Sequence, residues 1–474
     1  MMKAKRFFLS LLLCHQGLFA ANPPVTTLHV KVNVSPVFTG MISFSALDGK
    51  SDRCMNDIFF VEKDKSVAVF SKTLAATTQV IALNGCRLLT NAGDQVNLEL
   101  RPVYNGTEVV QGKYIPSCTG KDAARQLLPY LIDSLYTNVD LSNIKTTEQA
   151  NEYIAATTAV VAKKITTAKV TQADNLAALK AFEQARQLLF KFNFLDAHKE
   201  IVRTKELGDW YLQGYDFSAS GLTAFGDEDI SRQLAYLWRA GRRMQDSTIT
   251  EAKELTELLL QCKVDRIKER EAIAWIQIEG KERAFTPDMK MIYPITKAAL
   301  KPKTLSMHII DSLYKSYQQM EPGMPAYNFV LENDNGKMVR LSDFKGKIVI
   351  IDFWAMWCPS CVASLPNLKK IEESYKDKND IVFLTVAWED ASSDNRAKLK
   401  QFSIDHHIAG ENNLFLSFDP NDPQAKKVIE HYCLTGITRW VAIDQEGNII
   451  NGNIGHPLRP GFEQRIANCY QQRN

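Results

Sequence analysis

Beyond its first twenty residues, the sequence lacks any apolar run of about 18 residues, the length needed for a transmembrane helix. It also lacks a surplus of one charge, because without Lys3, Lys5 and Arg6 the basic residues equal the 54 acidic ones in number. Nucleic-acid-binding proteins normally carry a basic stripe, so this balance gives no support for binding nucleic acid. Repeats and low-complexity tracts are missing too. The ordinary composition of the 474 residues predicts globular domains, about three at this length.

The first twenty residues are predicted to be an export signal. Three basic residues precede an apolar run over 7–13, which is too short to cross a bilayer, and Ala20 and Ala21 offer small residues for cleavage. A buried N-terminal helix is one alternative, and Cys14 raises another, a lipid-anchored lipoprotein. We therefore expect an exported protein of the periplasm or cell envelope. Because thiols tend to pair in an oxidising compartment, we consider disulfide formation and exchange for the nine cysteines before metal binding.

The region over 22–118 has the pattern of β-structure. Apolar residues such as Leu28 and Val30 alternate with polar ones, and turn pairs such as Asn84-Gly85 recur at hairpin intervals. This pattern predicts an antiparallel β-sandwich, in which Cys54 and Cys86 could form a link that spacing alone does not establish.

From 119 to 320 the apolar residues follow helical spacing, which predicts an α-helical middle domain. The expected helices cover 125–136, 148–164, 176–192, 230–243 and 250–261. No H-E-x-x-H, G-x-S-x-G or phosphate-loop motif occurs in this region.

A Pro- and Gly-rich segment at 321–325 ends the helical pattern, and strands then alternate with helices. The expected strands cover 347–353, 381–388, 414–418, 440–444 and 449–454, and the expected helices cover 360–375, 394–407 and 462–470. This alternation predicts an α/β domain over 321–474 whose sheet is covered on both faces.

Cys358 and Cys361 lie in the segment WCPSC (357–361), where a predicted strand leads into a predicted helix. A zinc site would need a second ligand pair at comparable spacing, whereas Cys433 and Cys469 are isolated, so we expect no metal and no organic cofactor. A helix N-terminus stabilises the thiolate, which is the attacking species in disulfide exchange. We therefore predict that Cys358 attacks and that Cys361, one turn inside the helix, resolves the mixed disulfide.

Asp352 lies on the apolar strand, six residues before Cys358. A carboxyl group on such a strand is desolvated and titrates high, so it could accept the proton of Cys361 during resolution. The alternative is a hydrogen-bonded core acid. Glu389 and Asp390 end a later strand near the same edge, where charged loop residues are common.

The segments GMPAYNF (323–329), LSDFKGK (341–347) and DFWAMWC (352–358) resemble the opening of TlpA/ResA-type thiol–disulfide oxidoreductases, which are thioredoxin-fold proteins of the bacterial envelope. The resemblance covers 321–474 and implies a thioredoxin-like fold. Residue by residue, it implies that Cys358 and Cys361 are the attacking and resolving cysteines and that Asp352 is the buried acid. The β-region ending in GDQV (93–96) is similar to a domain of uncharacterised type that precedes such modules.

Two positions depart from the family pattern. Thr438 follows Ile437 where the family has a cis-proline facing the disulfide, and a cis bond before a non-proline residue costs about 3–4 kcal/mol. The sequence thus leaves open a trans peptide and a reshaped substrate groove, whose expected residues are Trp357, Pro359, Ile437 and Thr438. Ser364 replaces a glutamate that ResA-like proteins often carry three residues after the second cysteine.

Together these observations predict an exported thiol–disulfide oxidoreductase. Its expected partners are thiol or disulfide-bearing proteins of the envelope and an upstream electron donor. One alternative is a non-enzymatic binding or scaffold protein with a degenerate thioredoxin domain, which Thr438 and the long region before 321 motivate. The other is a thiol peroxidase, which would need Thr and Arg residues around the cysteine that 354–358 do not offer.

Overall fold

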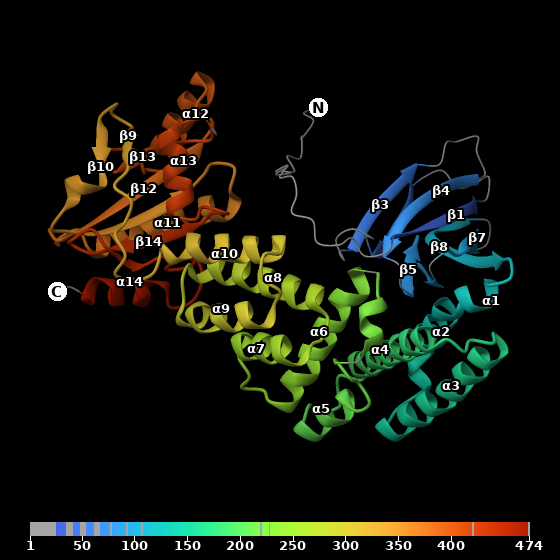
Figure 1. The fold of residues 1–474 in the computed structure, drawn as a ribbon. Helices are drawn as coiled ribbons and strands as arrows, with labels where there is room; N and C mark the ends of the chain where they lie inside the picture. The colour runs from blue at the N-terminus through green and yellow to red at the C-terminus, as the bar shows by residue number, and fades with distance from the viewer. Residues whose placement is uncertain are drawn as a thin grey trace. The chain divides into compact units, whose positions relative to one another are not determined.

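The computed structural model describes residues 25–34, 41–47, 54–60, 67–75, 78–91, 93–105, 108–218, 220–226, 228–419 and 421–472 (Figure 1). The predicted export signal and Cys14 lie outside these residues. Within the described ranges, no helix is both long enough and apolar enough to span a membrane. The chain divides into two compact units, Met1–Thr248 and Ile249–Asn474.

The first unit begins with eight strands: β1 (Val25–Val34), β2 (Met41–Leu47), β3 (Cys54–Phe60), β4 (Val67–Ala75), β5 (Gln79–Leu83), β6 (Cys86–Thr90), β7 (Gln95–Asn105) and β8 (Glu108–Thr119). They form two four-stranded sheets, of order β4-β1-β7-β8 and β3-β2-β5-β6. Phe44 and Ile81 from the second sheet pack in one core cluster with Val96 and Leu98 from the first.

Two expectations about this region are wrong. The pairing of β1 with β7 is parallel, with His29 opposite Gln95. Only strands joined by a tight turn must run antiparallel, and five strands separate β1 from β7. The suggested link between Cys54 and Cys86 is not made, because Cys86 is a buried free thiol. Strands β3 and β6 lie at opposite edges of their sheet, about 14 Å apart at the usual strand spacing, which is beyond the reach of a disulfide.

Helices follow the strands, as the apolar spacing predicts. They are α1 (Ala123–Gln126), α2 (Leu128–Thr137), α3 (Thr147–Thr167), α4 (Ala173–Ala197), α5 (Lys205–Leu212), α6 (Glu228–Gln245), α7 (Glu251–Gln261), α8 (Asp265–Arg283), α9 (Pro287–Ala299) and α10 (Leu305–Gln318). The sequence did not predict α5, α8, α9 and α10. In α8 the buried face includes Lys268, Glu271 and Glu279, which interrupt the apolar period. The boundary between the two units lies between α6 and α7, so α7 to α10 belong to the same unit as the α/β region.

The α/β region contains β9 (Val330–Asn333), β10 (Met338–Arg340), β11 (Ile348–Trp354), α11 (Pro359–Ser374), β12 (Ile381–Glu389), α12 (Ser393–Asp405), β13 (Asn413–Ser417), α13 (Pro423–His431), β14 (Arg439–Ile443), β15 (Ile449–Asn451) and α14 (Phe462–Gln471). The strands form one sheet of order β10-β9-β13-β12-β11-β14-β15. Strand β11 is parallel to β12 and antiparallel to β14. The predicted alternation of strands and helices is therefore present, with β9, β10 and α13 as additional short elements.

Strand β11 contributes to a core on each face of the sheet. Val349 and Ile351 pack in the cluster that includes residues of α8, α10 and α13. Ile350 and Trp354 pack in the cluster that includes residues of α11 and α14. Since side chains alternate along a strand, Asp352 is directed to the same face as Ile350 and Trp354, which α11 covers.

Candidate active site at the start of helix α11

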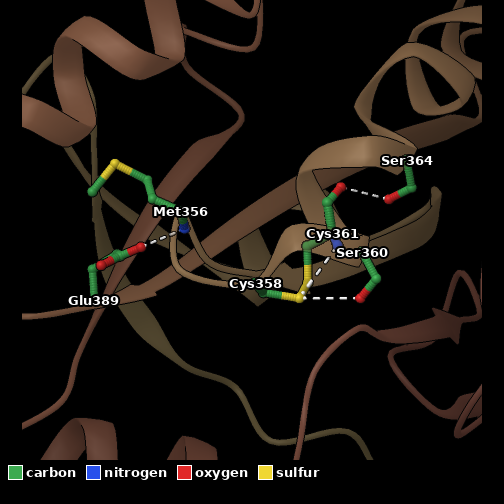
Figure 2. The surroundings of a disulfide bond; sticks show 6 residues. All are labelled: Met356, Cys358, Ser360, Cys361, Ser364 and Glu389. Atoms are coloured by element: carbon green, nitrogen blue, oxygen red, sulfur yellow. Dashed lines mark hydrogen bonds between the residues drawn. A yellow bond between two sulfur atoms is a disulfide. The ribbon is translucent and has the colours of Figure 1, made fainter. Parts of the chain in front are cut away.

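Cys358 and Cys361 are joined in a disulfide, with an S–S distance of 2.12 Å and a Cα–Cα distance of 5.3 Å (Figure 2). Cys358 is the N-cap residue of α11 and Cys361 lies in its first turn. Pro359 occupies the first helical position, where its missing N–H removes no helical hydrogen bond. The backbone N–H of Cys361 points to the Cys358 sulfur at 3.3 Å. The structure thus places one sulfur where the helix N-terminus favours a negative charge.

Five other cysteines provide a contrast. Cys86, Cys118, Cys262, Cys433 and Cys469 are all free thiols. Burial raises the pKa of Cys262, Cys433 and Cys469 to about 11 and that of Cys118 to about 12. Because the thiolate is the nucleophile, these thiols are poorly suited to exchange near neutral pH.

Asp352 is almost completely buried, with 1% of its surface exposed. Neither of its carboxylate oxygens has a hydrogen-bond partner among the described residues. Burial raises the pKa of Asp352 well above its usual range, and the negative charge of Glu372 on α11 raises it further. Burial also raises the pKa of Glu372, which the cation of Lys369 opposes. A carboxyl group in this state exchanges protons nearer to neutral pH than an exposed one.

The four expected groove residues lie on two loops. Trp357 and Pro359 are exposed at the start of α11. Trp357 lies beside Trp388 and Phe418, with ring centroids 6.4 and 5.8 Å away. Ile437 is half-buried and packs against the core cluster that contains Cys358 and Cys361. These two loops therefore meet the same core.

The Ile437–Thr438 peptide is cis, so the trans alternative left open by the sequence is wrong. The next residue, Arg439, is fully buried. Its side chain contacts residues that are distant in the sequence. Its guanidinium donates hydrogen bonds to the carbonyls of Cys433 and Gly452, on either side of the loop, at 3.3 and 3.4 Å.

Ser364 is buried in α11, and its hydroxyl donates a hydrogen bond to the Cys361 carbonyl at 2.7 Å (Figure 2). This is a contact within the helix, and it supplies no acid or base beside the sulfurs. The departure from the family pattern noted at this position therefore leaves Asp352 as the buried carboxyl on the α11 face of β11.

Glu389 is a site residue whose role the sequence analysis missed. It ends β12 with 3% of its surface exposed, and one carboxylate oxygen accepts a hydrogen bond from the Met356 amide at 2.6 Å (Figure 2). The other accepts one from the Asn395 side chain at 3.3 Å. Burial raises the pKa of Glu389. Its position at the end of a strand parallel to β11 was a signal, because parallel strands end at the same edge of a sheet.

Comparisons with known proteins concern the C-terminal third of the chain. The Redoxin family model matches residues 321–466. The thiol-disulfide oxidoreductase ResA of Bacillus thuringiensis subsp. konkukian (strain 97-27) is 27% identical over 160 residues, which cover 33% of this chain and 84% of that protein. ResA of Bacillus subtilis (strain 168) is 24% identical over 147 residues, which cover 31% of this chain and 74% of that protein. A crystal structure of the thioredoxin domain of a thiol-disulfide oxidoreductase from Bacteroides vulgatus is 26% identical, covers 31% of this chain and 96% of that chain, and has a TM-score of 0.26.

Taken with the geometry at the start of α11, the family match and the ResA relatives place the C-terminal domain among thioredoxin-like thiol–disulfide oxidoreductases. Within that class, residues 321–466 form a TlpA/ResA-like redoxin domain, which confirms the resemblance seen in the sequence.

Proposed function

We propose that the protein exchanges disulfides with thiol proteins through Cys358 and Cys361. The observation that carries the proposal is the disulfide between these residues at the N-terminus of α11. The helix N-terminus supports a thiolate on Cys358, while Cys361 is fully shielded from solvent. Two-step exchange requires that the attacking cysteine be more accessible than the resolving one. In the oxidised form both residues are buried, but Cys358 keeps 6% of its surface exposed and Cys361 keeps none, so Cys358 is the more accessible of the two.

In the reduced protein, the Cys358 thiolate attacks one sulfur of a substrate disulfide. A mixed disulfide forms, and the other substrate sulfur leaves as a thiolate that takes a proton from water. The Cys361 thiol passes its proton to the Asp352 carboxylate and attacks the Cys358 sulfur. The Cys358–Cys361 disulfide is restored, and the second substrate sulfur leaves as a thiolate. Two electrons pass to the substrate, and the reverse sequence oxidises a substrate dithiol.

The expected substrates are proteins that carry a disulfide or a thiol pair, bound between the loops of Trp357 and Thr438. Continued reduction would need an upstream electron donor to reduce the pair again. We further propose that the protein is exported to the periplasm or cell envelope, on the basis of the N-terminal sequence pattern. Cell fractionation tests export: the full-length chain should reach the envelope fraction, whereas a chain without residues 1–20 should stay in the cytoplasm.

Insulin reduction in the presence of dithiothreitol tests the exchange activity. We expect the wild type to accelerate precipitation of the insulin B chain and Cys358→Ser to fall to the rate of dithiothreitol alone. Cys262→Ser, which alters a buried free thiol at the C-cap of α7, is the matched control and should act as the wild type. Equal rates for the wild type and Cys358→Ser would favour the scaffold alternative. Peroxide consumption that depends on Cys358, without insulin reduction, would favour the peroxidase alternative.

A further inference from the structure

The C-terminal end of α8 contacts the loop that precedes β14. The Arg439 guanidinium donates hydrogen bonds to the carbonyls of Gly280 and Lys281 at 3.2 and 3.4 Å. The Asn453 amide donates to the carbonyls of Lys281 and Glu282 at 2.9 and 3.1 Å. The carbonyls of Lys281 and Glu282 are among those that the end of a helix leaves without intrahelical partners, whereas the Gly280 carbonyl also accepts a hydrogen bond from the Ala284 amide at 3.0 Å. Helix α8 precedes the redoxin domain in sequence, yet it ends beside the proposed substrate groove.

Lys281 lies over Gly436 in this arrangement. A Cβ atom placed on Gly436 would lie 3.4 Å from Cε and 3.9 Å from Nζ of Lys281. Gly436 immediately precedes Ile437 and Thr438, the two residues expected to line the groove. These are ordinary van der Waals distances, so the end of the Lys281 side chain lies against the backbone of the loop at Gly436.

The charge of Lys281 is available to a ligand. Its side chain is exposed, and no ion pair joins it to another of the described residues. Its neighbours differ: Glu282 pairs with Arg459 at 3.1 Å, and Arg283 pairs with Glu279 at 3.0 Å. The other cation at this place, Arg439, is buried against carbonyl groups. Among the described residues, the exposed charge at the end of α8 that has no ion-pair partner is therefore the ammonium group of Lys281.

We propose that the end of α8 forms one wall of the substrate groove and that Lys281 selects polypeptides with an acidic side chain near the reacting cysteine. This proposal rests on the proposed function, because it concerns the substrates of the same disulfide. A polypeptide that lies along Ile437 and Thr438 passes Gly436, and there the lysine ammonium can reach a carboxylate. Lys281 makes no contact with the sulfurs, so its effect belongs to binding and should alter KM more than kcat.

Two disulfide-bonded peptides that differ only in the residues flanking their cysteines, aspartate in one and lysine in the other, test the proposal. The full-length protein reduces each peptide with dithiothreitol as electron source, and kcat/KM is measured. The wild type should prefer the aspartate peptide, and Lys281→Glu should change the ratio of the two kcat/KM values by about three- to tenfold, the effect expected for a few exposed charge contacts. The preference should largely disappear at about 1 M salt, where the Debye length is about 3 Å.

Lys378→Glu is the matched control, because it makes the same change in net charge. Lys378 is exposed and follows the C-terminus of α11, about 24 Å along that helix from the disulfide. It should leave the ratio as in the wild type. Equal changes from both variants, or no change from Lys281→Glu in a protein that reduces both peptides, would overturn the role of Lys281 and leave the proposed function intact. Reduction of neither peptide by the wild type would overturn both.

Discussion

The Met356 amide donates a hydrogen bond to the Glu389 carboxylate, with nitrogen and oxygen 2.6 Å apart. Met356 lies two residues before Cys358, and Glu389 ends the strand parallel to β11. The turn that leads to Cys358, the proposed attacking cysteine, is therefore tied to the neighbouring strand by a buried carboxylate. This contact gives Glu389 a positioning role, since it acts on the sulfur through the backbone.

Glu389→Ala should weaken the turn before Cys358. The substitution removes the acceptor of the Met356 N–H, and the loss of one such partner costs about 1–3 kcal/mol of stability. Glu389→Gln keeps an oxygen acceptor and should restore most of the loss. Thermal unfolding and the reduction potential of the disulfide, equilibrated against dithiothreitol, measure both effects. Equal behaviour of the two variants would argue against a role for the acceptor oxygen.

Asp352→Asn should stabilise the protein at pH 8. The pKa of Asp352 is raised on folding, so as pH rises from the ordinary carboxyl range toward the raised pKa, the unfolded state binds fewer protons than the folded state and stability falls. Asparagine removes this penalty, which we expect to be about 1–3 kcal/mol, the cost of an unsatisfied buried group. The difference should vanish below about pH 3, where the aspartate is protonated in the folded and in the unfolded state. Unfolding of the two oxidised proteins at both pH values measures it, and a difference independent of pH would contradict the assignment.

Glu372→Gln should lower the pKa of Asp352, because the charge of Glu372 contributes to the raised value. The pH dependence of alkylation of the reduced pair by iodoacetamide reports this change. The inflection that Asp352 causes in the plot of alkylation rate against pH should move to lower pH in Glu372→Gln. The same inflection should be missing in Asp352→Asn.

Glu373→Gln is the control for that measurement. Glu373 is the next residue of α11, but it is exposed and forms an ion pair with Lys376. Its substitution should leave the profile unchanged. A shift of the same size in both glutamine variants would mean that the field of the whole helix, and not the charge of Glu372, acts on Asp352.

Cys361→Ser should trap a mixed disulfide. Cys358 can still attack a substrate, but no thiol remains one helical turn away to displace it. Non-reducing electrophoresis should show a covalent adduct that dithiothreitol cleaves, while Cys358→Ser forms none. An adduct on the Cys358→Ser variant instead would reverse the proposed roles of the two cysteines.

The site residues nearest in sequence were predictable because local geometry relates them. Cysteines three apart at the start of a helix lie within reach of one another wherever that helix is placed, and a disulfide joins Cys358 to Cys361. Asp352 was predictable as a buried acid because alternation along an apolar strand directs its side chain into a core. Most strands and helices of 321–474 followed from the same short-range periods, but the short elements β9, β10 and α13 did not.

Other features depend on segments that are distant in sequence. The Met356–Glu389 contact joins the turn after β11 to the end of β12 across 33 residues, and Arg439 reaches Gly280 across 159. The cis peptide at Ile437–Thr438 and the parallel pairing of β1 with β7 are likewise absent from any local pattern. Hydrophobic period and helix geometry are properties of neighbours along the chain, so the amino-acid order alone predicted the pairing of Cys358 with Cys361 and the burial of Asp352. Which distant side chain holds the loop before Cys358, and which helix ends against the loop before β14, was decided by packing in the folded chain, because only there do these segments meet.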